Sequence, residues 1–284
     1  LIREGRAILE TLAESFRRRG DEILYPEGVR SFAVWLERNA KDADAGIIMA
    51  PDKALPSFIK ILEENTENLG CSAESAALCA DKLRTTKKLE SAEIPAPKIF
   101  SQDVRLKRYI IKPRFGCGAE NISVIDKFRR RRNFITCEFI EGEHISASLI
   151  VGKTILPLTI NKQCISFRDG RASYDGGIVP YDVGAKAAKE TIRVARRTVK
   201  ILGCEGYIGI DFVLRGGAEP FVVDVNPRPT TSIVGIARVI NYEIADLILR
   251  ARFGSLPKRV EIKGRCSFRK EELPKLNFYI EPDY

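Results

Sequence analysis

Apolar residues recur along the chain at two different spacings, and the spacing divides the chain into expected helices and strands. In residues 7–16 the apolar positions repeat every three to four residues, as on one face of a helix, and Gly20 marks its end. Residues 207–214 and 220–226 instead form short runs rich in β-branched and aromatic residues, which favour strands. The chain therefore mixes the two element types, and we expect an α/β fold built of α+β lobes.

The first part of the chain alternates helices with strands. Beyond the opening helix, helices are expected at 32–40 and 56–68, and strands at 23–25 and 45–51. This alternation predicts a small open parallel sheet, which we place at residues 1–76. Because the alternation starts with a helix, we expect a first strand just upstream of Leu1.

Strands dominate the remainder of the chain. Strands are expected at 108–113, 121–125, 134–140 and 144–151, and helices at 183–202, 233–240 and 242–253. Gly142 interrupts two of these strands, which suits a hinge between lobes, so we expect units at 77–142 and 143–284. The Tyr-Asp-Gly-Gly segment at 174–177 is expected to be a polar loop, either an ordinary surface loop or a substrate lid.

The two strands expected at 207–214 and 220–226 are joined by a glycine-containing turn and carry the most distinctive chemistry. Asp211 and Asp224 interrupt apolar runs, and Asn226 lies on the same strand face as Asp224. If the strands pair, two carboxylates and an amide oxygen converge, a set that suits a hard cation such as Mg²⁺. The alternative is a pair of edge-strand aspartates that face solvent, although charges within apolar strands are costly unless paired or metal-bound.

Several cationic residues stand beside turns or loops that suit a phosphate. Arg228 follows the second acidic strand directly and is a planar cation suited to phosphate or carboxylate. Lys112 ends an expected strand, and Gly116-Cys117-Gly118 follows as a flexible loop whose N–H groups can wrap phosphate oxygens. A plain hairpin turn is the alternative reading of that loop. Further upstream, Asp81 can cap a helix that begins with Lys82.

The composition is that of a globular protein and favours anionic partners. Of 284 residues, 44% are hydrophobic and 30% are charged, and the net charge is +9. Such a charge attracts nucleotide phosphates or nucleic acid. Two arginine clusters, at 17–19 and 129–132, have no interleaved aromatic residues of the kind that stack single-stranded nucleic acid. We therefore expect both clusters to be solvated faces.

Cysteine usage and hydropathy indicate a protein of the cytoplasm. The seven cysteines are odd in number and lack a CxxC pair, which argues against a disulfide framework or a zinc site. No apolar run approaches the ~18–20 residues of a membrane span. There is no signal-peptide pattern, but the chain opens at Leu1 without Met, so we expect the natural amino terminus to lie further upstream.

The order of these motifs resembles a known family. A D-K pair at 81–82, Lys112 with its glycine loop, E-F-I-E-G at 138–142, G-x-D at 209–211 and D-V-N-P-R at 224–228 follow one another. In this order they resemble the ATP-grasp carboxylate–amine ligases over roughly residues 70–250, with D-x-N-P-R the most specific part. The upstream sheet is similar to the pre-ATP-grasp domain of that superfamily. The resemblance therefore implies an ATP-grasp fold with an N-terminal open parallel sheet.

The resemblance also implies where ATP lies, between two antiparallel sheets, one from each lobe. Lys82 and Lys112 match the lysines on the α- and β-phosphates, and Gly116 and Gly118 match the lid over them. His144 stands where the family usually has a glutamate for the ribose, and an imidazole can also hydrogen-bond a hydroxyl. The hinge whose backbone reads adenine is matched by Cys137, Glu138, Phe139 and Ile140.

For the metal site, the resemblance implies two ions, Mg²⁺ or Mn²⁺, bound by Asp211, Asp224 and Asn226. The middle position is more often glutamate in the family, so bidentate reach to both ions is reduced here. Arg228 matches the arginine beside the reacting carboxylate, and we expect it to be catalytic together with Lys112.

The function implied is amide formation through an acyl phosphate, with release of ADP and phosphate. The opening helix, the D-K pair and VDVNPRPTTS are most similar to archaeal ligases of methanofuran biosynthesis, which implies L-glutamate and tyramine as substrates. Another acid and amine pair, a nucleotide-binding regulatory protein without the chemistry, and a nucleic-acid-binding protein are the alternatives. We expect neither a nucleic acid nor a membrane partner, and the sequence leaves a monomer or a homodimer open.

Overall fold

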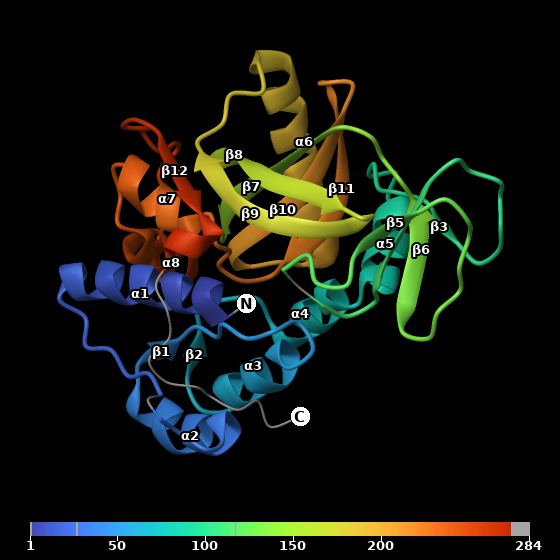
Figure 1. The fold of residues 1–284 in the computed structure, drawn as a ribbon. Coiled ribbons are helices and arrows are strands. Elements are labelled where there is room, and N and C mark those ends of the chain that lie inside the picture. Colours follow the sequence, from blue (N-terminus) through green and yellow to red (C-terminus); the bar gives the residue numbers. More distant parts are fainter. Residues whose placement is uncertain (1, 27, 117, 274–284) are drawn as a thin grey trace.

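The chain forms a small parallel sheet and a large antiparallel one (Figure 1). The structure is a computed structural model that describes residues 2–26, 28–116 and 118–273. The small sheet has two strands and the large sheet has ten. Both sheets and their helices lie in the order expected from the sequence, so the mixed fold with an N-terminal parallel sheet is confirmed.

The N-terminal unit holds the small sheet between helices. Its elements are α1 (Ile2–Arg19), α2 (Phe32–Asn39), η1 (Ala40–Asp42), β1 (Ala45–Gly46), α3 (Leu55–Glu63), β2 (Glu67–Asn68) and α4 (Ala73–Ala80). Strands β1 and β2 pair in parallel, with Ala45 opposite Glu67. A leucine and isoleucine core joins α2, α3 and α4, whereas α1 packs in a separate core with α7 (Ile233–Val239) and α8 (Ile244–Phe253).

Three expectations for this unit are wrong in detail. Residues 23–25 form no strand within the described chain, and the strand expected at 45–51 is limited to β1. The helix expected to reach residue 68 stops at Glu63, where the last turn tightens and the Asn65 N–H donates to Leu62 O three residues back. The next residues then form β2 instead of continuing the helix.

A small lobe follows, and it carries the glycine loop. Its elements are α5 (Lys82–Ser91), β3 (Ile99–Phe100), β4 (Tyr109–Pro113), β5 (Ser123–Ile125) and β6 (Phe134–Glu138). Strand β4 lies between β5 and β6, as the paired register of its residues requires. The expected strand–loop–strand arrangement around Lys112 is thus present. Arginines 129–132 are exposed, as expected for a solvated cluster.

The large lobe carries the remaining elements. These are β7 (Glu143–Val151), β8 (Ile155–Arg168), β9 (Arg171–Val179), α6 (Ala185–Leu202), β10 (Gly206–Arg215), β11 (Glu219–Asn226), α7 (Ile233–Val239), α8 (Ile244–Phe253), β12 (Cys266–Arg269) and η2 (Lys270–Glu272). The strand order is β11-β10-β7-β8-β9-β5-β4-β6-β3, with β12 on β9. The sheets of the two lobes therefore join where Ser123 of β5 faces Arg171 of β9.

The loop expected at 174–177 is wrong, because these residues belong to β9. The two glycines of this segment let the neighbouring strand β12 approach closely. A Cβ on Gly176 would lie 2.2 Å from Phe268 O of β12, and Gly176 has a φ of +136°, which favours glycine. The two glycines therefore allow β12 to pair with β9.

The large lobe buries one face of its sheet completely. Ile145, Ala147 and Leu149 of β7 point into a core closed by α6, whose Val194 and Val199 are fully buried. Alternate residues of a strand point to opposite faces, so the residues between them face the other side. That other side is apolar only at one end, where α1, α7 and α8 pack against it. Its uncovered end carries polar side chains and forms the candidate site.

Candidate active site

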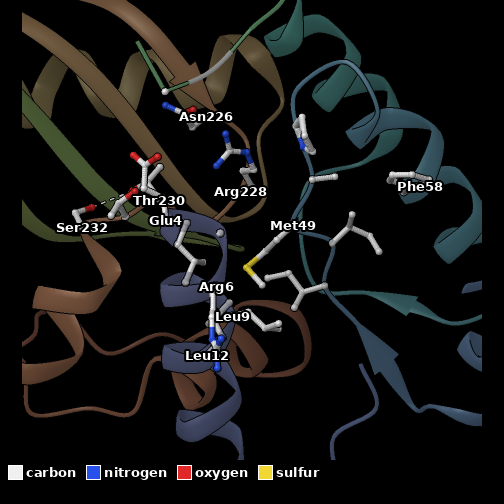
Figure 2. A pocket seen from close by; sticks show the side chains of 18 of the residues that line it. Glu4, Arg6, Leu9, Leu12, Met49, Phe58, Asn226, Arg228, Thr230 and Ser232 are labelled. Atoms are coloured by element: carbon white, nitrogen blue, oxygen red, sulfur yellow. Dashed lines mark hydrogen bonds between the residues drawn. The ribbon is translucent and has the colours of Figure 1, made fainter. Parts of the chain in front are cut away.

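A cavity of ≈ 1250 Å³ opens over the uncovered end of the large sheet. Figure 2 shows Asn226 and Arg228 at one end of it and the apolar Leu9, Leu12 and Met49 at the other. Nine of the residues expected to form the site line this cavity: Lys82, Lys112, Gly116, Gly118, His144, Asp211, Asp224, Asn226 and Arg228. Both lobes and the N-terminal unit therefore contribute to one cavity.

The sheet register places the polar side chains in one row. Asp211 of β10 lies opposite Asp224 of β11 on one side and Ser146 of β7 on the other, and Ser146 lies opposite Asn161 of β8. Directly opposed residues of antiparallel strands point to the same face. Four neighbouring strands thus present polar groups to the cavity at one level, and the hairpin expected to bring the two aspartates together is confirmed.

The acidic pair lies at the centre of this row. Asp211 accepts hydrogen bonds from Gln163 Nε2 at 2.8 Å and from Asn226 Nδ2 at 3.3 Å. Burial and the nearby Asp224 raise the pKa of Asp211 to about 7. A carboxyl in this setting gains from a cation that neutralises both charges. The site therefore fits a divalent ion with oxygen ligands from Asp211, Asp224 and Asn226.

The number of carboxylates limits which ion fits. Across the described residues, no group of three or more histidine, cysteine, aspartate or glutamate side chains could hold a metal. Two carboxylates and one amide leave the other coordination positions to water or phosphate, which is how Mg²⁺ is usually bound. The six cysteines that the structure describes are free thiols.

Lys82 reaches the acidic pair from the start of α5. The Asp81 side chain caps this helix by accepting from the N–H groups of Leu83 and Arg84, as the sequence predicted. Arg114 holds Asp81 in place with hydrogen bonds of 2.8 and 2.6 Å. Lys82 Nζ then lies 2.7 Å from Asp224 Oδ1.

Lys112 reaches the same strand from the small lobe. It lies on β4, only 7% exposed, and its Nζ donates to Val223 O at 2.7 Å. Val223 directly precedes Asp224, so the two lysines flank the acidic pair. The small lobe and β11 are thereby in contact at the position where the sequence predicted a triphosphate.

Asp52 of the N-terminal unit also belongs to the site, and the sequence pattern did not single it out. Its Oδ1 accepts from Arg228 Nη2 at 3.4 Å, and its Oδ2 lies 3.6 Å from Lys82 Nζ. Burial raises the pKa of Asp52 above its ordinary value, against the lowering effect of Lys82. The available signal was an acidic residue directly after the apolar run that ends at Pro51.

A second group that sequence reasoning missed lies beside the acidic pair. The Asn161 amide donates to Ser146 Oγ at 3.3 Å and to Ser148 Oγ at 3.4 Å. Ser148 Oγ in turn forms a hydrogen bond of 3.2 Å with Ser232 Oγ. Thr230 completes the chain at 2.9 Å from Ser232 (Figure 2). Asn161 Oδ1 is buried and has no hydrogen-bond partner within the described chain. Asn161 itself lines the cavity, so this buried polar chain supports the cavity wall beside the acidic pair.

The expected adenine hinge lies next to the cavity without lining it. None of the described lining residues comes from 137–140. Cys137 is buried in β6, where burial raises the pKa of its thiol, and Phe139 packs edge-on against Phe167 of the cavity wall. His144 does line the cavity, and burial, followed by Lys162, lowers its pKa. The adenine and ribose assignments of these residues stay predictions.

The sequence of the chain matches a known protein family. A model of the ATP-grasp domain matches residues 79–232, and a tyramine–L-glutamate ligase of Methanocaldococcus jannaschii is 32% identical over 275 residues. That alignment covers 88% of this chain and 83% of the relative. The chain belongs to the ATP-grasp family.

Solved ATP-grasp structures agree with this fold. A protein assigned to the ATP-grasp superfamily from Archaeoglobus fulgidus superposes with a TM-score of 0.76 at 30% identity, over 94% of this chain and 85% of that one. A D-alanine–D-alanine ligase from Bacillus anthracis has a TM-score of 0.68 at 17% identity, over 87% of this chain and 92% of that one, and shows the fold alone.

Among the described residues, no helix has the length and apolarity to span a membrane.

Proposed function

We propose that the protein is an ATP-dependent carboxylate–amine ligase that joins L-glutamate to tyramine. The observation that carries the proposal is the convergence of Lys82, Lys112, Arg228 and the acidic pair on one cavity. The substrate pair is proposed from the Methanocaldococcus relative, whose name gives tyramine and L-glutamate. The family membership is established, whereas this substrate pair is part of the proposal.

The cavity has room for more than a nucleotide. Typical ligand pockets measure about 300–1,000 Å³, and this one measures ≈ 1250 Å³. Its apolar end at Leu9, Leu12 and Met49 offers the surface that an aromatic ring needs (Figure 2). Its polar end suits a triphosphate and a carboxylate. Both observations support a ligase that holds three substrates together.

The charges of the site suit the first step of the reaction. A carboxylate and a triphosphate repel each other, so cationic groups must neutralise both before attack at the γ-phosphorus. Lys82 and Lys112 would contact the phosphates, and Arg228, which lines the same cavity, would orient the carboxylate. Held by Asp211, Asp224 and Asn226, Mg²⁺ or Mn²⁺ would neutralise further phosphate charge.

Bond formation then follows from this placement. A carboxylate oxygen bonds to the γ-phosphorus as the bond to ADP breaks, which gives an acyl phosphate. The amine nitrogen bonds to the acyl carbon, phosphate leaves with that oxygen, and the nitrogen loses a proton. Gly116 and Gly118 lie on the loop at the cavity, where closure would exclude water that hydrolyses the acyl phosphate.

The experiment is a screen for ADP release over amino acids crossed with amines, with Mg²⁺ and ATP. We expect ADP, phosphate and the glutamate–tyramine amide in equal amounts. With ¹⁸O in the glutamate carboxyls, we expect one ¹⁸O in the released phosphate, because the acyl-phosphate route transfers that oxygen. A protein that binds ATP but forms no ADP with any pair would refute the ligase proposal and favour a regulatory nucleotide-binding protein.

A matched variant controls for contaminating ATPases. Lys112→Met keeps the length and apolar stem of the side chain and removes the charge that lies against β11. We expect ADP formation by this variant to fall by at least about 100-fold, as for the loss of a preorganised charge at a transferring phosphoryl group. ADP release that is equal in the variant would assign the activity to a contaminant.

A further inference from the structure

An acidic residue of the N-terminal unit enters the phosphate end of the ATP-grasp site. Asp52 is only 4% exposed, and its two oxygens contact two different cations, Lys82 and Arg228. Lys82 begins α5, whereas Arg228 follows β11, so these two cations come from distant parts of the chain. Through Asp52 the N-terminal unit therefore contacts both of these cations.

The backbone around Asp52 is fixed by the start of α3. The N–H groups of Ala54 and Leu55 both donate to Pro51 O, at 2.9 and 3.0 Å, and Leu55 is completely buried. A buried carboxylate is unfavourable unless opposite charges surround it. The two cations supply that compensation, and the rigid turn holds the carboxylate between them.

Lys82 contacts two carboxylates, Asp224 and Asp52, and the first of these is also an expected metal ligand. Its Nζ lies 2.7 Å from Asp224 Oδ1, and Asp224 is one of the oxygen groups assigned to the cation. When a cation takes Asp224, this contact weakens through charge repulsion. A lysine ammonium on a flexible stem is then held more firmly in place by a further fixed anion. Asp52 Oδ2, at 3.6 Å, is in position to do so.

We propose that Asp52 is a positioning residue that keeps the Lys82 ammonium and the Arg228 guanidinium directed into the site when metal and triphosphate occupy Asp224. The part that concerns Arg228 rests on the proposed ligase function, whereas the part that concerns Lys82 requires only nucleotide binding. The N-terminal unit thus contributes to phosphate binding as well as to the shape of the cavity.

Calorimetric binding of Mg²⁺ with the non-hydrolysable analogue AMP-PNP tests the first part without any acid or amine. For Asp52→Asn, which is isosteric, we expect the Kd to rise about tenfold. If the asparagine variant lacks a cooperative unfolding transition, Asp52→Ser removes the same carboxylate with a smaller side chain. A Kd within twofold of the unmodified protein in a folded variant would overturn the proposal.

A double-mutant cycle shows whether Asp52 acts through Lys82. In the Lys82→Met background we expect Asp52→Asn to change the Kd by less than twofold, because the ammonium that it positions is gone. An undiminished tenfold effect in that background would overturn the proposal. Asp246→Asn is the matched control, since Asp246 also bridges two cations, Arg19 at 2.8 Å and Arg250 at 2.6 Å, away from the cavity. We expect the Kd of the Asp246→Asn variant to stay within twofold of the Kd of the unmodified protein.

Substrate-dependent ADP formation tests the second part. We expect Asp52→Asn to lower kcat by about tenfold or more, and to add little to the loss caused by Arg228→Gln. Full additivity of the two losses would overturn the role toward Arg228. If the unmodified protein forms no ADP with any acid and amine, the ligase proposal fails, while the calorimetric result for Lys82 still decides the first part.

Discussion

Asp211→Asn is expected to stabilise the metal-free protein and to abolish its stabilisation by Mg²⁺ with nucleotide. The pKa of Asp211 in the folded protein is about 7, compared with about 4 for an unfolded aspartate. A raised folded-state pKa means that the protonated carboxyl contributes stability at low pH. This contribution is complete below about pH 4 and is lost as the pH rises through 7.

The magnitude follows from the size of the pKa shift and from the hydrogen bonds of the site. Three pKa units correspond to about 4 kcal/mol of lost stability at pH 8. Asparagine has only one acceptor oxygen, so it keeps the contact with either Gln163 or Asn226 and loses the other, at about 1–2 kcal/mol. The net expected gain at pH 8 is therefore about 2–3 kcal/mol.

Urea unfolding in EDTA, followed between pH 4 and pH 8, measures this difference. The advantage of the variant should grow with pH, and Mg²⁺ with AMP-PNP should stabilise only the unmodified protein. Asp175→Asn is a control of opposite sign, because hydrogen bonds from Ser173 and Ser166 lower the pKa of the exposed Asp175. Its removal should slightly destabilise the protein above pH 4. A variant at Asp211 that is less stable than the parent at pH 8, or whose difference does not depend on pH, would refute the electrostatic reasoning.

Three further outcomes are expected. Gly209→Ala should destabilise the protein by about 1–3 kcal/mol in urea unfolding, since its Cβ would lie 2.3 Å from Thr230 Cγ2 and would overpack the contact. An unchanged midpoint would mean that Thr230 moves aside freely. Cys204 should resist thiol reagents at pH 8 until the protein unfolds, because hydrogen bonding of its protonated thiol with Cys71 and Cys79, together with burial, raises its pKa. The exposed Cys164 should react at once. Alanine at all four of arginines 129–132 should leave ADP formation within about twofold, as for surface substitutions, and a large loss would place this cluster in the substrate path.

The sequence by itself determined those parts of the site that lie close together along the chain. Asp211, Asp224 and Asn226 belong to two strands joined by a short turn, so alternation and turn chemistry were enough to bring them together. The same holds for the Asp81 cap and Lys82, where the contacts lie within one helical turn. In each case the interaction is local, and local patterns carry the information.

Only the tertiary structure decided the contacts that join distant segments. Lys82 and Asp224 are 142 positions apart, and Asp52 and Arg228 are 176 positions apart, so no periodicity links them. The glycines at 176 and 177 indicated a loop when taken alone, because their true reason is the approach of β12 from about ninety positions further on. Such pairs form when separate elements pack into one core, and the free energy that selects them comes from burial across the whole fold.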